Sequence, residues 1–511
     1  MTTAAEMLAT DFATLPDLIA AHGRERGARI AIADDAGQID YAALDARMDR
    51  IAAALQRDGV AVGSAIAIVA SPSVDYGCVF LGALRAGCVA TPIAPSATAA
   101  AIAAMIADCA APIVFLDAEN AAALADQDSS ARRIRLDQDL DAWLAPVGAT
   151  PAPVSIAPGD GFNIIYSSGT TGTPKGIVQS HAMRWAHISR NAAAGFDEAV
   201  TMLATPLYSN TTLVSFLPTL GWGGTAVLMK KFDARRFLEL AERHRATHTM
   251  LVPVQYQRIM ALPDFDSFDL ASFRLKTSTS APFAAALKAD VVARWPGILL
   301  EYYGMTEGGA STGLNATEFP TKLHTVGRPL PGHVIKLIDE DGVEVPSGGM
   351  GEVVGRSPTM MTGYHGREGA TREAEWFDAD GHRYIRHGDV GRFDEDGFLV
   401  LLDRKKDLII SGGFNIYPSD LEAVLAQHPA VADCTVVGAP SEAWGETPVG
   451  FYVPRDGAGD DDAAILAWFN AQVGKTQRLA ALHRADELPR SAIGKVLKRE
   501  LRDRLTATGA A

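Results

Sequence analysis

The chain contains 511 residues, of which 48% are hydrophobic and 21% are charged. This length predicts two or more domains, and the composition is that of a globular protein rather than a disordered one. The formal net charge of −15 argues against non-specific binding to nucleic acid or to an anionic membrane.

The N-terminal segment MTTAAEMLATDF has no basic region followed by an apolar run, so it does not resemble a secretory signal. The most apolar stretch, residues 212–229, is interrupted by Pro218 and by glycines, which predicts core elements rather than a membrane span. The four cysteines are scattered without metal-ligand spacing, which is typical of free thiols in a reducing compartment. The cytoplasm is therefore the expected location.

Short β-branched runs alternate with Ala- and Leu-rich stretches through the first half of the chain. This alternation is typical of α/β layers with largely parallel sheets. Residues 145–160, which are rich in Pro and Gly, are expected to form a surface connection. The expected strands are residues 65–70, 111–116, 226–229 and 248–254, and the expected helices are residues 41–56, 73–86, 97–109, 234–245 and 283–294.

After about residue 403 the pattern restarts as a smaller unit. Helices are expected near residues 418–427 and 461–473, and strands near residues 432–438 and 448–454. The charged run DRKKD at residues 403–407 precedes this unit, although such a run is by itself typical of a solvated turn. We therefore expect one domain at residues 1–403 and a second at residues 404–511.

The most distinctive segment is YSSGTTGTPKG at residues 166–176, which follows an expected strand at residues 162–165. Its glycines permit tight turns and close approach of the backbone to an anion, and its hydroxyls and lysine suit a triphosphate. A P-loop would need GxxxxGK[ST], which this segment lacks; a flexible linker is the other interpretation. The candidate phosphate-binding residues are Ser167, Ser168, Gly169, Thr170, Thr171, Gly172, Thr173 and Lys175.

The segment SSGTTGTPKG resembles the phosphate-binding signature of the adenylate-forming superfamily, which includes acyl- and aryl-CoA synthetases, adenylation domains of nonribosomal peptide synthetases, and firefly luciferase. Segments that resemble four further family motifs follow in the family's order, and the resemblance spans most of residues 25–505. It implies an α/β fold. The large N-terminal domain would hold two α/β subdomains and a smaller β-rich one, and the small C-terminal domain would be a mobile α+β unit.

The segment YGMTE at residues 303–307 resembles the second motif. The resemblance implies that Thr306 contacts the α-phosphate and that Glu307, with Thr170, reaches Mg²⁺. A carboxylate beside a triphosphate is tolerable when a cation lies between them, whereas a Thr-Glu pair alone would be interpreted as a helix cap. The implied nucleotide site also includes Ser280, Ala281, Pro282, Glu301, Tyr302, Tyr303, Gly304 and Met305.

The other motifs lie towards the C-terminus. HGD at residues 387–389 and LDRKKD at residues 402–407 imply that Asp389 and Arg404 bind the ribose and that Lys406 is a hinge. SGGFNIYPSDLE at residues 411–422 implies that Gly412 and Gly413 let pantetheine lie against the backbone.

The last motif is PRSAIGKVLK at residues 489–498, which resembles the family's C-terminal PRxxxGKxxK element. It implies that Lys495 bridges the substrate carboxylate and the α-phosphate, where its charge assists the attack of one anion on another. Outside this ordered set of motifs, Lys495 would be interpreted as a surface lysine.

Three segments resemble those that form the family's acid pocket, with departures. Ser209 replaces a common His, Thr279 and Ser280 are bulkier than the usual Gly and Ala, and Tyr302 is expected to fill part of the cavity. These substitutions favour a short-chain, medium-chain or aromatic monocarboxylate. The expected pocket residues are Tyr208, Ser209, Thr279, Tyr302 and Gly304.

The resemblance implies an ATP-dependent carboxylate–CoA ligase that forms acyl-AMP and pyrophosphate and then acyl-CoA and AMP. ATP, Mg²⁺ and coenzyme A are the expected cofactors, the acid and CoA are the expected partners, and a monomer or homodimer is expected. Two alternatives stay open. One is a stand-alone adenylation enzyme that loads a carrier protein, and the other is an inactive homologue that only binds nucleotide.

Overall fold

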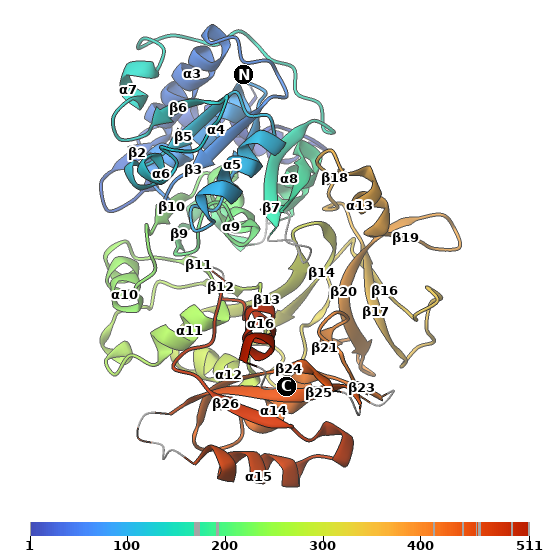
Figure 1. The fold of residues 1–511 in the computed structure, drawn as a ribbon. Helices are drawn as coiled ribbons and strands as arrows, with labels where there is room; N and C mark the ends of the chain where they lie inside the picture. Colours follow the sequence, from blue (N-terminus) through green and yellow to red (C-terminus); the bar gives the residue numbers. More distant parts are fainter. Residues whose placement is uncertain are drawn as a thin grey trace. The chain divides into compact units, whose positions relative to one another are not determined.

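The computed structural model describes residues 2–167, 174–190, 194–411, 414–441, 444–455, 457, 461–491 and 494–508. The chain forms two compact units. Figure 1 labels the helices and strands along the chain. Unit 1 comprises Met1–His324, Pro329–Val334 and Gly355–Ile385, and unit 2 comprises Thr325–Arg328, Ile335–Val354 and Arg386–Ala511. The expected domains, residues 1–403 and a mobile domain at residues 404–511, are defined by movement and not by compactness. They therefore stay a prediction.

The first sheet of unit 1 carries the segment that resembles a phosphate loop. Its strand order in the described chain is β18-β8-β7-β4-β3-β5-β6. The inner strands pair in parallel, as expected, whereas β7 pairs antiparallel with β8, and β8 antiparallel with β18. The strands are β3 (Ala65–Val69), β4 (Val89–Pro92), β5 (Ile113–Leu116), β6 (Arg132–Arg135), β7 (Gly161–Ser167), β8 (Lys175–Ser180) and β18 (Gly363–Tyr364).

The second sheet of unit 1 contains the order β14-β13-β12-β11-β9-β10-β1-β2. Parallel pairing runs from β13 through β10 to β1, and β13 turns back antiparallel into β14. The strands are β1 (Ile30–Ala33), β2 (Gln38–Asp40), β9 (Val200–Leu203), β10 (Thr225–Leu228), β11 (His248–Leu251), β12 (Leu275–Ser278), β13 (Ile298–Met305) and β14 (Gly308–Asn315). The expected strands of the first half of the chain are thus confirmed, except that residues 253 and 254 begin helix α11 (Pro253–Met260) and do not belong to β11.

Helices α3 (Tyr41–Arg57), α4 (Val74–Arg85) and α9 (Asn210–Gly221) share one hydrophobic core with strands of both sheets of unit 1. Asp40 and Ser73 accept hydrogen bonds from backbone N–H groups in the first turns of α3 and α4, which explains where these helices begin. The expected helices are confirmed, including α5 (Ala99–Asp108), α10 (Ala234–Arg243) and α12 (Ala285–Arg294). The apolar stretch at residues 212–229 forms most of α9 and β10, as expected.

Unit 2 contains one whole sheet and most of another. In one, β17 (Met350–Arg356) lies between β16 (Val334–Ile338) and β20 (Arg383–Phe393), and β21 (Leu399–Arg404) pairs with β20. The other has the order β23-β22-β25-β24, with β26 (Ala481–Arg484) paired to β25. Its strands are β22 (Ile409–Ser411), β23 (Phe414–Ile416), β24 (Val431–Ser441) and β25 (Gly445–Pro454).

The helices of unit 2 pack against the C-terminal sheet in two groups. Helices α14 (Pro418–Leu425) and α15 (Asp462–Gln472) share a core with Val436 and Tyr452, whereas α16 (Lys498–Thr508) shares one with Val437 and Phe451. Neighbouring residues of a strand point to opposite faces, so the two groups cover opposite faces of this sheet. The expected C-terminal helices and strands are confirmed.

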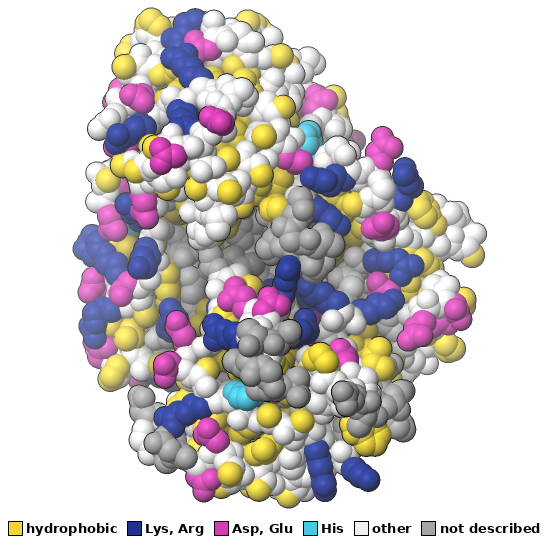
Figure 2. All heavy atoms as spheres, in the orientation of Figure 1, with side chains coloured by type: hydrophobic (Ala, Val, Ile, Leu, Met, Phe, Trp, Pro, Cys, Tyr) yellow, Lys and Arg dark blue, Asp and Glu magenta, His cyan; other side chains and the backbone are white. Residues whose placement is uncertain are grey.

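In the described part of the chain, no helix is both long and apolar enough to cross a membrane. All four cysteines are free, and burial raises the pKa of Cys78 and Cys88 to about 12. On the face drawn in Figure 2, Lys and Arg side chains (dark blue) are interspersed with Asp and Glu side chains (magenta) over the described residues.

Candidate active site

The phosphate-loop segment lies between two antiparallel strands, β7 and β8. The expected contacts from Ser168 to Thr173 fall outside the described residues, and for Ser167 only the backbone is described. Lys175 begins β8, and its ammonium lies 5.1 Å from the centroid of the Tyr364 ring. Gly176 follows, where a Cβ atom would come within 2.9 Å of Ile164. The end of the motif is therefore packed tightly against its own hairpin.

Thr306 and Glu307 form the turn between β13 and β14 rather than a helix cap. The Thr306 carbonyl accepts a 2.7 Å hydrogen bond from Nε2 of Gln179 on β8. Oε1 of Glu307 accepts a 2.9 Å hydrogen bond from the Tyr364 hydroxyl. Gly308 closes the turn with φ +89°, and a Cβ there would lie 1.8 Å from the Thr359 carbonyl oxygen, so only glycine fits.

The Glu307 carboxylate fits the expected Mg²⁺ contact. Among the described residues, the carboxylate accepts a hydrogen bond from the neutral Tyr364 hydroxyl, and no described cation forms an ion pair with it. Mg²⁺ in nucleotide sites is usually held by one or two carboxylates together with phosphate oxygens, and a half-buried carboxylate of this kind suits that role. Thr170, the other expected metal contact, lies outside the described residues.

Two segments expected at the acid pocket lie together in unit 1. The hydroxyls of Ser280, after β12, and Thr211, in α9, are 2.6 Å apart. Ser209 caps α9 through the Thr211 N–H. Ser280 has φ +81°, a left-handed conformation that is strained for a residue with a Cβ, and such strain concentrates at functional sites.

The side chains of the segment before Thr306 lie in different surroundings. Glu301 is 4% exposed and its carboxylate pairs with the buried Lys288, so this side chain is engaged within the protein. Burial raises the pKa of Tyr302 by more than the nearby Arg190 charge lowers it. Gly304 lies where a Cβ would come within 2.7 Å of Ser311 Oγ. Tyr303 and Met305 complete β13, and Ala281 and Pro282 follow Ser280 after β12.

Unit 2 brings together the residues expected at the ribose. Asp389 on β20 lies directly opposite Arg404 on β21, and Arg404 Nε is 3.3 Å from Asp389 Oδ1. Lys406 follows two residues later and is exposed. Partial desolvation lowers its pKa, as do the charges of Arg404 and Arg502. The expected CoA contacts Gly412 and Gly413 lie outside the described residues.

Lys495 lies in a tight turn of the same unit. Ser491 N–H donates a 2.8 Å hydrogen bond to the Lys495 carbonyl, and Arg490 Nη1 donates a 2.7 Å hydrogen bond to the Gly494 carbonyl. Burial, together with the charges of Arg404 and Lys406, lowers the pKa of Lys495 to about 8, against a smaller opposing effect of Asp389 and Asp407. Lys495 is therefore within electrostatic reach of the expected ribose and hinge residues.

The side chains that organise the described site are not all in the motifs. Gln179, Tyr364 and the buried Arg184 contact motif residues or their supports, yet Gln179 and Arg184 lie in ordinary strand and helix patterns of the sequence. Tyr364 follows Gly363 in a segment without regular periodicity, and we find no sequence signal that marks it.

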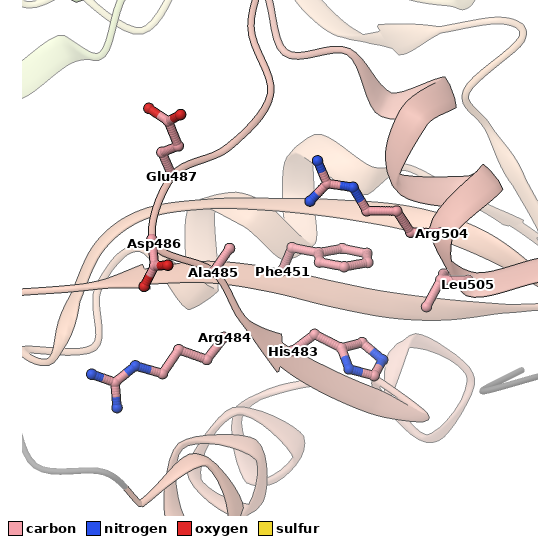
Figure 3. A pocket seen from close by; sticks show the side chains of 8 residues that line it. All are labelled: Phe451, His483, Arg484, Ala485, Asp486, Glu487, Arg504 and Leu505. Atoms are coloured by element: carbon pink, nitrogen blue, oxygen red, sulfur yellow. The ribbon is translucent and has the colours of Figure 1, made fainter. Parts of the chain in front are cut away.

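A separate pocket of about 640 Å³ lies within unit 2, between β25, β26 and α16 (Figure 3). Phe451, His483, Arg484 and Arg504 are among the residues that line it. None of the residues expected at the nucleotide or acid site lines this pocket.

Comparisons with known proteins agree with the motifs. Residues 19–365 match the family described as AMP-binding enzyme, and residues 420–495 match its C-terminal domain. The chain is 33% identical over 520 residues to 4-coumarate–CoA ligase-like 9 of Oryza sativa subsp. japonica, which covers 96% of this chain and 93% of that protein. It is 30% identical over 508 residues to the fatty acid–[acyl-carrier-protein] ligase ScoC of Streptomyces coeruleorubidus, with 96% of each covered.

Among solved structures, the fold is similar to that of ATP-bound MatB from Rhodopseudomonas palustris. The TM-score is 0.84 at 30% sequence identity, and the match covers 96% of this chain and 99% of that chain. The similarity extends over both the larger N-terminal and the smaller C-terminal part. The chain therefore belongs to the AMP-binding enzyme family, the adenylate-forming enzymes that include the AMP-forming acyl- and aryl-CoA synthetases.

Proposed function

We propose that this protein joins a carboxylic acid to coenzyme A through an acyl-adenylate. The observation that carries the proposal is the Thr306–Glu307 turn, which is held by Gln179 and Tyr364 beside the strand that leaves the phosphate-loop segment. A carboxylate is a poor acyl donor because its leaving group would be an oxide. Transfer of AMP to the acid supplies a good leaving group.

In the first step, a carboxylate oxygen of the acid attacks the α-phosphorus of ATP, and the bond to pyrophosphate breaks. Thr306 and Lys495 stabilise the charge that develops on the α-phosphate, and Lys175 holds the outer phosphates. Asp389 accepts hydrogen bonds from the ribose hydroxyls, with Arg404 beside it. Mg²⁺, held by Glu307 and Thr170, would neutralise phosphate charge when bound.

In the second step, the CoA sulfur attacks the acyl carbonyl and AMP leaves. We propose that residues 404–511 turn about Lys406 between the steps, so that Lys495 serves adenylation and Gly412 and Gly413 serve thioester formation. This exchange is proposed because adenylation and thioester formation need different groups around the same acyl carbon.

The proposed acid is a short-chain, medium-chain or aromatic monocarboxylate. The Ser280–Thr211 hydrogen bond places polar groups between two expected pocket segments, and the largely enclosed Tyr302 occupies space at a third. The name of the rice relative, which likens it to 4-coumarate–CoA ligases, supports an aromatic acid. The reaction is proposed to take place in the cytoplasm, in a monomer or a homodimer.

Transfer to a carrier protein is the second candidate, because the Streptomyces relative is named as an acyl-carrier-protein ligase. An inactive nucleotide-binding homologue is the third. Acid-dependent exchange of labelled pyrophosphate into ATP separates an enzyme from a binder, and an acid panel from C2 to C16 with aromatic acids identifies the substrate class. If none of the acids in the panel supports pyrophosphate exchange, the proposal is contradicted. Thioester formation with a carrier protein but not with CoA would favour the second candidate.

A further inference from the structure

Arg184 lies in helix α8 (His181–Ser189), and none of its surface is exposed. Arginine is almost never fully buried unless its charge is paired. Here no carboxylate among the described residues pairs with it, and its guanidinium instead donates to three side-chain amide oxygens. Burial lowers the pKa of Arg184 to about 9, so the group is still protonated at neutral pH.

The three acceptors belong to three parts of the expected active site. Arg184 Nε donates 2.8 Å to Oδ1 of Asn163 on β7, and Nη2 donates to Oε1 of Gln179 on β8. These two strands enter and leave the phosphate-loop segment. Nη1 donates 2.9 Å to Oδ1 of Asn210, the first residue of α9, which follows the expected pocket residues Tyr208 and Ser209.

Arg184 also fixes which way the Gln179 amide points. Oε1 of Gln179 accepts from Arg184 and, at 2.9 Å, from Asn163 Nδ2, so the amide nitrogen is directed away from both donors. That nitrogen donates the 2.7 Å hydrogen bond to the Thr306 carbonyl. Without Arg184, the amide loses one of the two donors that set its orientation, and the bond to Thr306 is no longer enforced.

We propose that Arg184 is a positioning residue for acyl-adenylate formation: through Gln179 it holds Thr306 against the α-phosphate, and through Asn210 it holds the start of α9 at the acid pocket. This inference rests on the proposed function. Because Arg184 is fully buried, it acts through these side chains and not by direct contact with substrate. Removal of Arg184 alone leaves buried amide oxygens without this donor and is therefore also expected to cost stability, so kcat and thermal unfolding must be measured together.

Two substitutions separate positioning from folding. Arg184→Met removes the charge and the three hydrogen bonds at similar volume. Gln179→Glu keeps acceptor oxygens for Arg184 and adds a compensating charge, but it has no N–H group for the Thr306 carbonyl. The matched control is Arg85→Met in α4, because Arg85 is also largely enclosed but pairs with Asp45 and Asp49.

The measurements are acid-dependent ATP–pyrophosphate exchange, thioester formation from supplied acyl-AMP, and the midpoint of thermal unfolding. Because small misplacements of catalytic groups cost about 100-fold, Arg184→Met and Gln179→Glu are each expected to lower kcat for exchange by about 10- to 100-fold. The KM for ATP is expected to change less than about twofold, since Lys175 and the loop are intact. Arg85→Met is expected to lower the unfolding midpoint and to leave kcat unchanged.

Wild-type kcat in both site variants would overturn the inference, as would an equal fall in the Arg85→Met control. If Arg184→Met does not fold, Gln179→Glu and Arg184→Lys decide. Arg184→Lys keeps the charge and is expected to retain part of the wild-type kcat. Absence of exchange in the wild-type protein with every acid would contradict the proposed function itself, and the inference would fail with it.

Discussion

The Tyr364 hydroxyl donates a 2.9 Å hydrogen bond to the Glu307 carboxylate, across 57 positions of sequence. The same ring faces the Lys175 ammonium at 5.1 Å. Tyr364 belongs to β18, which pairs with β8, and the nearby Met361 N–H donates to the Glu307 carbonyl. The short segment at residues 361–364 thus connects the strand that leaves the phosphate loop with the turn proposed to reach the metal.

We predict that Tyr364→Phe raises the Mg²⁺ concentration needed for half-maximal adenylation by about 10-fold or more. The substitution frees the Glu307 carboxylate from its hydrogen bond but keeps the ring that faces Lys175, so the KM for ATP should change little. Loss of a partner that orients a metal ligand typically weakens metal affinity by about 10- to 100-fold. The measurement is a Mg²⁺ titration of acid-dependent pyrophosphate exchange.

Tyr41→Phe is the matched control for Tyr364→Phe. Tyr41 is fully buried and its hydroxyl donates to the Gly224 carbonyl at 2.7 Å, away from the site. This control should lose stability without a change in Mg²⁺ dependence. An unchanged Mg²⁺ titration in Tyr364→Phe would show that the hydrogen bond does not orient Glu307.

Lys495→Ala is expected to slow acyl-AMP formation by at least about 100-fold while sparing thioester formation from supplied acyl-AMP. The reason is that a preorganised charge aimed at the α-phosphate acts in the first step alone. The two half-reactions are measured separately, by pyrophosphate exchange and by CoA consumption from synthetic acyl-AMP. Equal loss of both would count against alternation of residues 404–511.

The pKa of Lys495 predicts a pH dependence. Burial, with Arg404 and Lys406 nearby, lowers this pKa to about 8, so Lys495 is charged below pH 8 and neutral above it. Because kcat/KM reports the free enzyme, kcat/KM for adenylation should fall as pH rises through about 8, by about tenfold per pH unit. In Lys495→Arg the remaining activity should show no such alkaline fall, because arginine stays charged. A flat wild-type profile from pH 7 to 9.5 would exclude this role of the lysine charge.

The sequence predicted the α/β class and the order of elements well, because these depend on local hydrophobic periodicity. Residues 65–70 form β3 and residues 418–427 hold α14, as their patterns indicate. It also predicted that Asp389 and Arg404 act together, and the structure pairs them across β20 and β21.

The supports of the site were beyond sequence reasoning. Thr306 and Glu307 match a motif, but the groups that hold them, Gln179 and Tyr364, come from other strands and have no pattern of their own. Arg184 is the clearest case, since a charged residue in a helix is expected to face solvent, and this one is enclosed. Side-chain networks between distant segments depend on tertiary packing, which periodicity does not encode.

The buried Lys288–Glu301 pair predicts a structural role for the Glu301 side chain. Lys288→Met should lower the free energy of unfolding by about 3–5 kcal/mol, because it leaves a buried carboxylate without its cation. Replacing both residues with methionine should recover most of this loss. The measurement is denaturant unfolding of both single variants and the double variant. Additive losses in the double variant would contradict a coupled pair.

Tyr302→Ala is predicted to shift acid preference toward larger substrates. If Tyr302 fills part of the acid cavity, its removal creates space that a longer or bulkier acid occupies, and the ratio of kcat/KM between large and small acids should rise by about tenfold or more. Competition between two acids in one reaction measures this ratio directly. An unchanged ratio would place Tyr302 outside the cavity.

The most direct test of the central claim is the product balance of the purified protein with ATP, Mg²⁺, CoA and a panel of acids, read by mass spectrometry. The account predicts that at least one monocarboxylic acid yields AMP, pyrophosphate and its CoA thioester in equal amounts, and that omission of the acid abolishes all three. Release of ADP and phosphate in place of AMP and pyrophosphate, or no AMP with any acid, would contradict it.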